Sequence, residues 1–140
     1  MHVLLVDDFE PFRKWLASQL QIEGLELVSE ASDGIEAVQM AKELQPKLIF
    51  MDIGLPRLNG IEAARKIQAV SPGSRILFLS ADSSPTMVEE ALSLNTYFSY
   101  VAKQDAASEF RAAMDALLRG ESYVSSSARV TKRLQSGEFD

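Results

Sequence analysis

Cysteine is absent from this sequence of 140 residues, and His2 is its single histidine. Without cysteine the chain can form no disulfide, no thiolate zinc site and no cysteine nucleophile. One histidine cannot build a histidine metal cluster. Oxygen-ligated metals such as Mg²⁺ are therefore the kind of metal that the composition allows.

Basic residues and long apolar runs are also scarce. The chain has 14 Lys and Arg against 20 Asp and Glu, a formal net charge of −6, whereas gripping a phosphate backbone needs a clustered basic face. No apolar stretch approaches the roughly 20 residues that cross a bilayer. The run Val3–Val6 is not preceded by the basic residues that begin an export signal. We expect a cytoplasmic protein that makes no contact with membranes.

Short apolar runs alternate with segments whose apolar residues recur at helical spacing. The runs lack polar alternation, so they predict a parallel sheet covered by helices on both faces. The fold class predicted is α/β, a doubly wound (βα)₅ domain with right-handed crossovers. The predicted strands are Val3–Val6, Leu25–Val28, Leu48–Met51, Ile76–Leu79 and Phe98–Ala102.

Helix start signals and a change of character near the end of the chain support this division. Asp33 and Asn59 are each followed three residues later by Glu, and Ser84 precedes a proline, which predicts three helix N-caps. After Gly120 the chain becomes serine-rich and then basic. We expect one domain over 1–120, followed by a tail or linker helix over 121–140.

Polar side chains follow four of the five predicted strands: Asp7 and Asp8, Asp52, Ser80, and Lys103. Ligands of open parallel sheets bind at the carboxyl ends of the strands. In the strand order 2-1-3-4-5 the first and third strands are neighbours, which would bring the three aspartates together. Such a cluster is repulsive, and one Mg²⁺ would neutralise it.

Each of these residues also has an ordinary explanation. An Asp pair before a helix can be a cap, Asp52 can belong to a loop shaped by turn residues, and Lys103 can be an exposed charge at a strand end. Their joint occurrence at strand ends, in chain order, favours a shared site.

With these residues, 1–120 resembles the receiver domain of bacterial two-component response regulators, which has a flavodoxin-like fold with sheet order 2-1-3-4-5. The tail resembles the segment after the receiver in regulators with a LuxR-type helix-turn-helix, by Gly120, Tyr123 and Ser125. The receiver match is carried by Asp7-Asp8, Asp52-Ile53-Gly54-Leu55-Pro56, Gly60, Ser80-Ala81 and Tyr100-Val101-Ala102-Lys103.

The resemblance implies that Asp52 is the phosphoacceptor, receiving a phosphoryl group from a phosphohistidine of a sensor histidine kinase. Asp8, Asp52 and the backbone carbonyl of Gly54 would ligate Mg²⁺, with Asp7 helping through water. Lys103 would pair with the acceptor carboxylate and then with a phosphoryl oxygen. The domain would not be an enzyme in its own right, although it would catalyse its own phosphorylation and dephosphorylation.

The resemblance also implies a switch and an output. Ser80 would turn toward the phosphoryl group, and Tyr100 would follow it inward, although Tyr100 is equally consistent with an ordinary strand aromatic. The expected output is transcription control, with DNA bound only through an output domain that this chain lacks. Homodimer formation on phosphorylation is a further expectation.

Three other interpretations stay open at this stage. A phosphohydrolase of the haloacid dehalogenase type needs a second Asp two residues after the nucleophile, where this chain has Gly54. A flavin-binding module would place Asp7 and Asp8 against a phosphate. The chain can also be a stand-alone, phosphorylation-switched binding module. Residues 94–99 depart from the receiver pattern, and their aromatics Tyr97 and Phe98 either fill the core or contact a partner.

Overall fold

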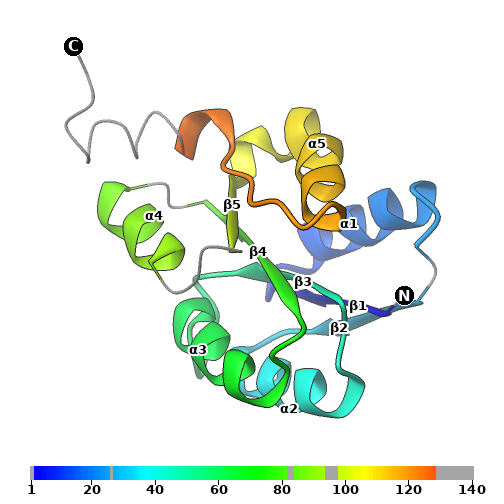
Figure 1. Cartoon of the computed structure of the whole chain (residues 1–140), viewed down its shortest axis with the longest axis vertical. Helices are drawn as coiled ribbons and strands as arrows, with labels where there is room; N and C mark the ends of the chain where they lie inside the picture. The colour runs from blue at the N-terminus through cyan, green and yellow to red at the C-terminus, as the bar shows by residue number, and fades with distance from the viewer. Residues whose placement is uncertain (1, 26, 82–83, 94–97, 129–140) are drawn as a thin grey trace. The chain divides into compact units, whose positions relative to one another are not determined.

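The computed structural model describes residues 2–25, 27–81, 84–93 and 98–128 (Figure 1). Its strands form a five-stranded sheet in the order β2-β1-β3-β4-β5, which confirms the predicted fold class. The elements in chain order are β1 (His2–Val6), α1 (Glu10–Ile22), β2 (Leu27–Ala31), α2 (Gly34–Leu44), β3 (Leu48–Asp52), α3 (Gly60–Val70), β4 (Arg75–Ser80), α4 (Pro85–Leu92), β5 (Ser99–Ala102), the 3₁₀ turn η1 (Lys103–Asp105) and α5 (Ala106–Leu118).

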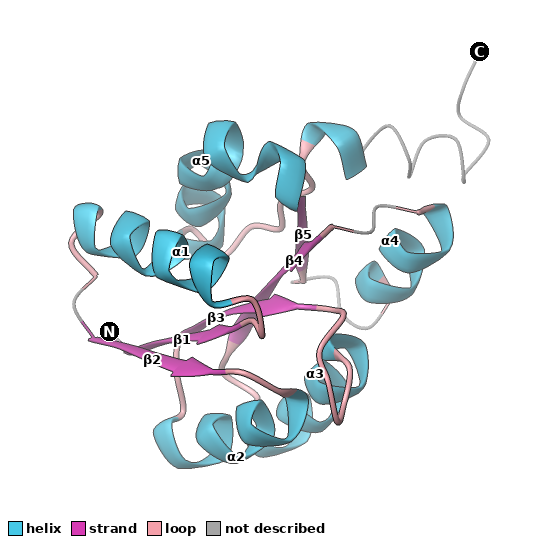
Figure 2. Ribbon diagram, turned by 180° about the vertical axis from the view of Figure 1, so that it is seen from behind, coloured by secondary structure: helices cyan, strands magenta, loops and turns pink. Residues whose placement is uncertain are grey.

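The chain forms two compact units, residues 1–76 and 77–140. In the first unit β1 pairs in parallel with β2 on one side and β3 on the other. Helix α1 covers one face of these strands, and α2 and α3 pack together on the opposite face (Figure 2). Buried β1 and β3 residues form the centre of the core, as strands covered on both faces require.

The predicted second strand, 25–28, is wrong in its position, because Leu25 lies in the turn that closes the end of α1 (Glu10–Ile22). Gly24 has φ +84°, its N–H donates to the Gln21 carbonyl at 3.0 Å, and the Leu25 N–H donates to the Leu20 carbonyl at 3.0 Å. This is the Schellman arrangement, which often uses an apolar residue after the glycine. Strand β2 therefore begins at Leu27 and continues to Ala31.

The three predicted N-caps are confirmed. The Asp33 carboxylate accepts from the Glu36 N–H at 2.8 Å, and the Asn59 side chain accepts from the Glu62 N–H at 3.0 Å. The Ser84 hydroxyl is the corresponding cap of α4. Each satisfies an N–H that has no partner inside its helix, so local sequence fixes where α2, α3 and α4 begin.

In the second unit β4 and β5 pair in parallel, and α4 and α5 both contact β5 (Figure 1). Phe98 is buried, and its ring meets that of Phe78 edge to face, with centroids 5.7 Å apart. Of the two aromatics singled out in the sequence, Phe98 therefore fills the core. Tyr97, with the rest of 94–97, lies outside the described residues.

Residues 121–128, here called the C-terminal strap, lie along β5. The Tyr100 N–H donates to the Tyr123 carbonyl at 2.8 Å, and the Ser125 N–H donates to the Tyr100 carbonyl at 2.9 Å. A helical turn begins at Ser126. The predicted boundary at residue 120 stays a prediction, and the predicted linker beyond residue 128 falls outside the described residues.

Within the described ranges, none of the helices combines the length and the apolar character needed to cross a membrane.

Candidate functional site

The first part of the candidate site is the loop between β1 and α1. Asp7 follows directly after β1 and is 4% exposed. Its N–H donates to the Ala31 carbonyl at 3.1 Å, and its carboxylate accepts from the Phe9 N–H at 2.8 Å. Asp8 follows and is exposed. The chain thus presents one fixed, buried carboxylate beside one that faces solvent.

Strand β3 supplies the third carboxylate. Asp52 is the last residue of β3 and is 8% exposed. Because β1 and β3 are adjacent and parallel, with Val6 in register with Met51, their carboxyl ends lie together. Asp7, Asp8 and Asp52 each offer a carboxylate oxygen, and these oxygens all lie within 4.8 Å of one another.

This donor set suits a hard divalent cation. Mg²⁺ takes oxygen ligands, retains several waters and is held by one or two carboxylates in phosphoryl-transfer sites. The combination of buried Asp7 and Asp52 with exposed Asp8 provides carboxylate oxygens with an open side for water. Three carboxylates this close repel one another when ionised, so a cation has an electrostatic reason to bind here.

The loop after Asp52 is shaped by close backbone contacts. The Gly60 N–H donates to the Ile53 carbonyl at 2.7 Å, and a Cβ at Gly60 would collide with the Asp52 carbonyl oxygen and the Ile53 backbone. A Cβ at Gly54, in contrast, would meet nothing within 4 Å. Gly60 is therefore required for packing against the end of β3, whereas Gly54 occupies open space.

The start of α2 braces the same loop. Arg57 adopts φ +68°, an uncommon backbone conformation for a residue with a side chain, and its Nη1 lies 3.1 Å from the Asp33 carboxylate. The backbone N–H of Glu36, and then the charge of Arg57, lower the pKa of Asp33. A Cβ at Gly34 would collide with the Leu58 backbone. From the sequence Asp33 was predicted only as a cap, and its contact with Arg57 comes from the tertiary structure.

Two further residues that sequence reasoning missed support the β1–α1 loop. The Arg13 guanidinium donates from Nη1 to the Asp7 backbone carbonyl at 2.6 Å and from Nε to the Glu30 carboxylate at 2.7 Å. Burial works to raise the pKa of Glu30, but the hydrogen bond from Arg13 and the charges of Arg13 and Lys14 hold it below its ordinary value. No residue spacing in the sequence predicts the contact between Arg13 of α1 and Glu30 near the end of β2.

The second unit carries the remaining predicted residues. Ser80 ends β4, is 4% exposed and is in register with Ala102 of β5. Lys103 follows Ala102 directly and is half-buried in η1. Tyr100 is fully buried in the middle of β5, in register with Phe78. Ser80 and Lys103 thus lie at the carboxyl ends of neighbouring strands.

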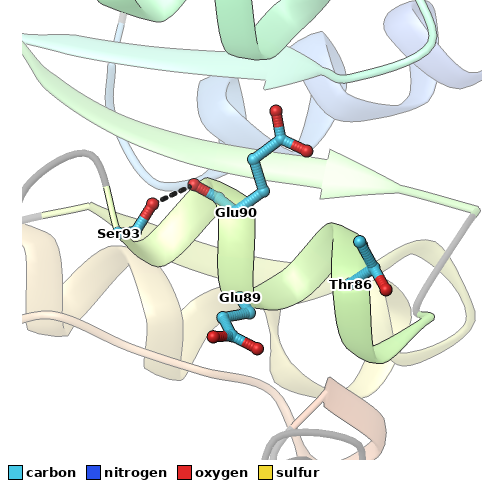
Figure 3. Close-up of a pocket in the computed structure, with 4 residues that line it drawn as sticks. All are labelled: Thr86, Glu89, Glu90 and Ser93. Atoms are coloured by element: carbon cyan, nitrogen blue, oxygen red, sulfur yellow. Dashed lines mark hydrogen bonds between the residues drawn. The ribbon is translucent and has the colours of Figure 1, made fainter.

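Helix α4 also borders a surface hollow (Figure 3). The described residues that line it are Thr86, Glu89, Glu90 and Ser93, and the Ser93 hydroxyl donates to the Glu90 carbonyl at 2.8 Å. The predicted site residues are not among these described lining residues. The hollow is therefore a feature of the exposed helix and adds no group to the candidate site.

Comparison with known proteins shows the same architecture. Residues 3–115 match the family described as response regulator receiver domain. The chain is 40% identical over 90 residues to chemotaxis protein CheY of Thermotoga maritima, covering 64% of this chain and 75% of that protein. It is 37% identical to the transcriptional regulatory protein LiaR of Bacillus subtilis, covering 99% of this chain and 67% of LiaR.

Some relatives are considerably longer than this chain, which spans 41% of LnrK, another transcriptional regulatory protein of Bacillus subtilis. A solved structure of a LuxR-family two-component response regulator from Aurantimonas superposes with a TM-score of 0.88 at 26% identity, covering 97% of both chains. The isolated REC domain of RcsB from Salmonella, at 22% identity and a TM-score of 0.81, shares the fold.

Proposed function

Because this chain belongs to the family of response regulator receiver domains, we propose that it accepts a phosphoryl group on Asp52 from a phosphohistidine of a sensor histidine kinase. The observation that carries the proposal is the meeting of Asp52 with Asp7 and Asp8 at the end of β1. An acceptor carboxylate beside two further carboxylates is arranged for a reaction that brings in a cation and a phosphoryl group.

The proposed step exchanges one bond to phosphorus for another. A carboxylate oxygen of Asp52 attacks, the P–N bond to the donor imidazole breaks, a P–O bond forms, and the imidazole takes up a proton from water. The product is an acyl phosphate, which water can hydrolyse, so the modification is reversible. The same site would then support phosphorylation and dephosphorylation of its own aspartate.

Asp8, Asp52 and the backbone carbonyl of Gly54 would hold Mg²⁺, with Asp7 contributing through water. Bound there, Mg²⁺ would neutralise charge on the phosphoryl oxygens. Lys103, at the end of β5, would pair with the Asp52 carboxylate and then with a phosphoryl oxygen. Mg²⁺ and the Lys103 ammonium would thus offset the repulsion among the carboxylates and the charge on the phosphoryl oxygens.

The conformational response would use Ser80 and Tyr100. The added phosphoryl group carries about −1.5 to −2 charges at neutral pH and strong acceptor oxygens. The Ser80 hydroxyl would turn to donate to one of them, and Tyr100 would move with it. Such a step biases a two-state element rather than creating a new fold.

The proposed output is control of transcription, as in the regulators named above. LiaR and LnrK extend beyond the part that this chain covers, so DNA would be bound through an additional output domain. Homodimer formation on phosphorylation would bring two such domains together. The similarity to CheY supports a second candidate, a switch that binds a partner protein without an output domain.

The test is the intact mass of the purified chain after incubation with Mg²⁺ and phosphoramidate. We expect a gain of one phosphoryl group for the wild type and none for Asp52→Asn. The matched control is Glu62→Gln, which changes a partly exposed carboxylate on α3, and it should be labelled like the wild type. Labelling of Asp52→Asn would show that the acceptor has been misassigned.

A further inference from the structure

The side chain of Arg13 connects three elements around the acidic cluster. It extends from α1, is 14% exposed, and reaches the backbone carbonyl of Asp7 at 2.6 Å and the Glu30 carboxylate at 2.7 Å. Asp7 directly follows β1, and Glu30 is a residue of β2. A planar guanidinium holds its N–H donors in a rigid fork, whereas the ammonium group of lysine is a compact charge on a flexible stem.

The backbone of Asp7 is consequently held at both of its polar groups. Its N–H donates to the Ala31 carbonyl at 3.1 Å, and its carbonyl accepts from Arg13. Glu30 directly precedes Ala31 in β2, and its carboxylate orients Arg13. The peptide unit before Asp7 is therefore held by β2, and the peptide unit joining Asp7 to Asp8 is held by Arg13 of α1.

This anchoring opposes a definite force. Asp7, Asp8 and Asp52 place carboxylate oxygens within 4.8 Å of one another, and like charges at this separation push the loop outward. The positive charge of Arg13 lies against the backbone between two of these residues. Arg13 in turn pairs with Glu30, which Lys14 also contacts at 3.4 Å.

We propose that Arg13, oriented by Glu30, is a positioning residue that holds the Asp7–Asp8 backbone in the arrangement that binds a divalent cation. The proposal rests on the proposed function, because it concerns the affinity of the same carboxylates for Mg²⁺. Arg13 acts through the backbone and touches neither the cation nor the phosphoryl group. Groups that orient metal ligands change metal affinity about 10- to 100-fold when removed.

The experiment measures the Mg²⁺ dissociation constant by titration calorimetry, at a temperature where circular dichroism shows each variant folded. We expect Arg13→Met to weaken Mg²⁺ binding about tenfold. Arg13→Lys keeps the charge without the fork and should weaken it to a similar extent, and Glu30→Gln should weaken it less. The matched control is Arg65→Met, which removes an exposed arginine of α3 that pairs with Glu62 at 3.8 Å.

A second readout separates positioning from general loss of structure. We expect the half-saturating Mg²⁺ concentration for labelling by phosphoramidate to rise in Arg13→Met, while the rate at saturating Mg²⁺ stays near that of the wild type. A fall in the saturated rate with an unchanged half-saturating concentration would contradict positioning. Full retention of Mg²⁺ affinity in Arg13→Lys would show that charge alone matters and would also overturn the proposal.

Two further arms separate this inference from the proposed function. The wild type must bind Mg²⁺, and Asp8→Asn must lose most of that binding. Failure of these two arms would count against the magnesium site itself. Wild-type binding that Arg13→Met leaves unchanged would overturn only the role of Arg13.

Discussion

Gly60 occupies a position at the start of α3 where the end of β3 leaves room for a hydrogen atom only. A Cβ there would meet the Asp52 carbonyl oxygen and the Cα of Ile53. Both are backbone atoms, so neither can rotate away as a side chain would. We expect Gly60→Ala to lower the free energy of unfolding by about 1–3 kcal/mol, the range for overpacking a close-fitting site, measured by urea denaturation.

Gly73 provides the matched control for this substitution. A Cβ at Gly73 would meet nothing within 4 Å, so Gly73→Ala should change the free energy of unfolding by less than about 1 kcal/mol, in the stabilising direction. Equal destabilisation by both substitutions would show that contact with the end of β3 does not decide the role of Gly60.

At the scale of elements, the C-terminal strap (residues 121–128) is the feature that strand and helix patterns in the sequence do not predict. Besides its backbone bonds to Tyr100, it places the Ser125 hydroxyl 2.9 Å from the Ala102 N–H that donates to it. The Glu109 carboxylate of α5 accepts from the Tyr123 hydroxyl at 2.7 Å and from the Ser126 N–H at 3.1 Å. The strap therefore lies beside β5 and is anchored to α5 through Glu109.

Glu109 should make strap docking sensitive to acid. Burial works to raise its pKa and Asp105 adds to this, but the hydrogen bonds from Tyr123 and Ser126 outweigh both and lower it from its ordinary value of 4.5. A lowered pKa in the folded state stabilises the fold fully above the ordinary value. That contribution is lost as the pH falls below 4.5 and through the lower folded value.

The corresponding substitution is Glu109→Gln. It retains one acceptor oxygen but removes the charge, and we expect a loss of about 1 kcal/mol at neutral pH together with a flatter acid limb of the stability curve. Amide hydrogen exchange of Ser126 and Tyr100 should become faster. The control is Glu121→Gln, whose exposed pair with Arg119 spans 3.3 Å and should contribute little. Unchanged exchange in Glu109→Gln would contradict the role of Glu109 in anchoring the strap.

At the scale of the whole molecule, the acidic cluster should couple metal binding to stability. A ligand that binds only the folded state stabilises it by about 1.4 kcal/mol at a concentration ten times its dissociation constant. We expect the thermal midpoint to rise with MgCl₂ and to respond far less to NaCl at equal ionic strength.

Asp8→Asn should have two opposite effects on the same measurement. It removes one of the three neighbouring carboxylates, so the metal-free protein should unfold at a higher temperature because repulsion is relieved. The rise produced by MgCl₂ should largely disappear. A variant that keeps the full response to MgCl₂ would place the cation elsewhere.

Much of this arrangement could be predicted from residues close together in the sequence. The alternation of apolar runs with helical periodicity predicted the fold class. Asp33 and Asn59 identified helix starts because a cap and the N–H that donates to it are three residues apart. The polar residues after the strands predicted the meeting of Asp7, Asp8 and Asp52, since parallel neighbours end at one edge.

The sequence by itself therefore determined the elements, their class and the three carboxylates of the first unit, because these depend on short spacings and on the rule that parallel strands share an edge. Only the tertiary structure decided that Arg13 joins Asp7 to Glu30 and that the strap pairs with Tyr100. These contacts depend on hydrogen bonds between separate elements. Such bonds are fixed by the three-dimensional placement of each donor and acceptor, which no local pattern of residues encodes.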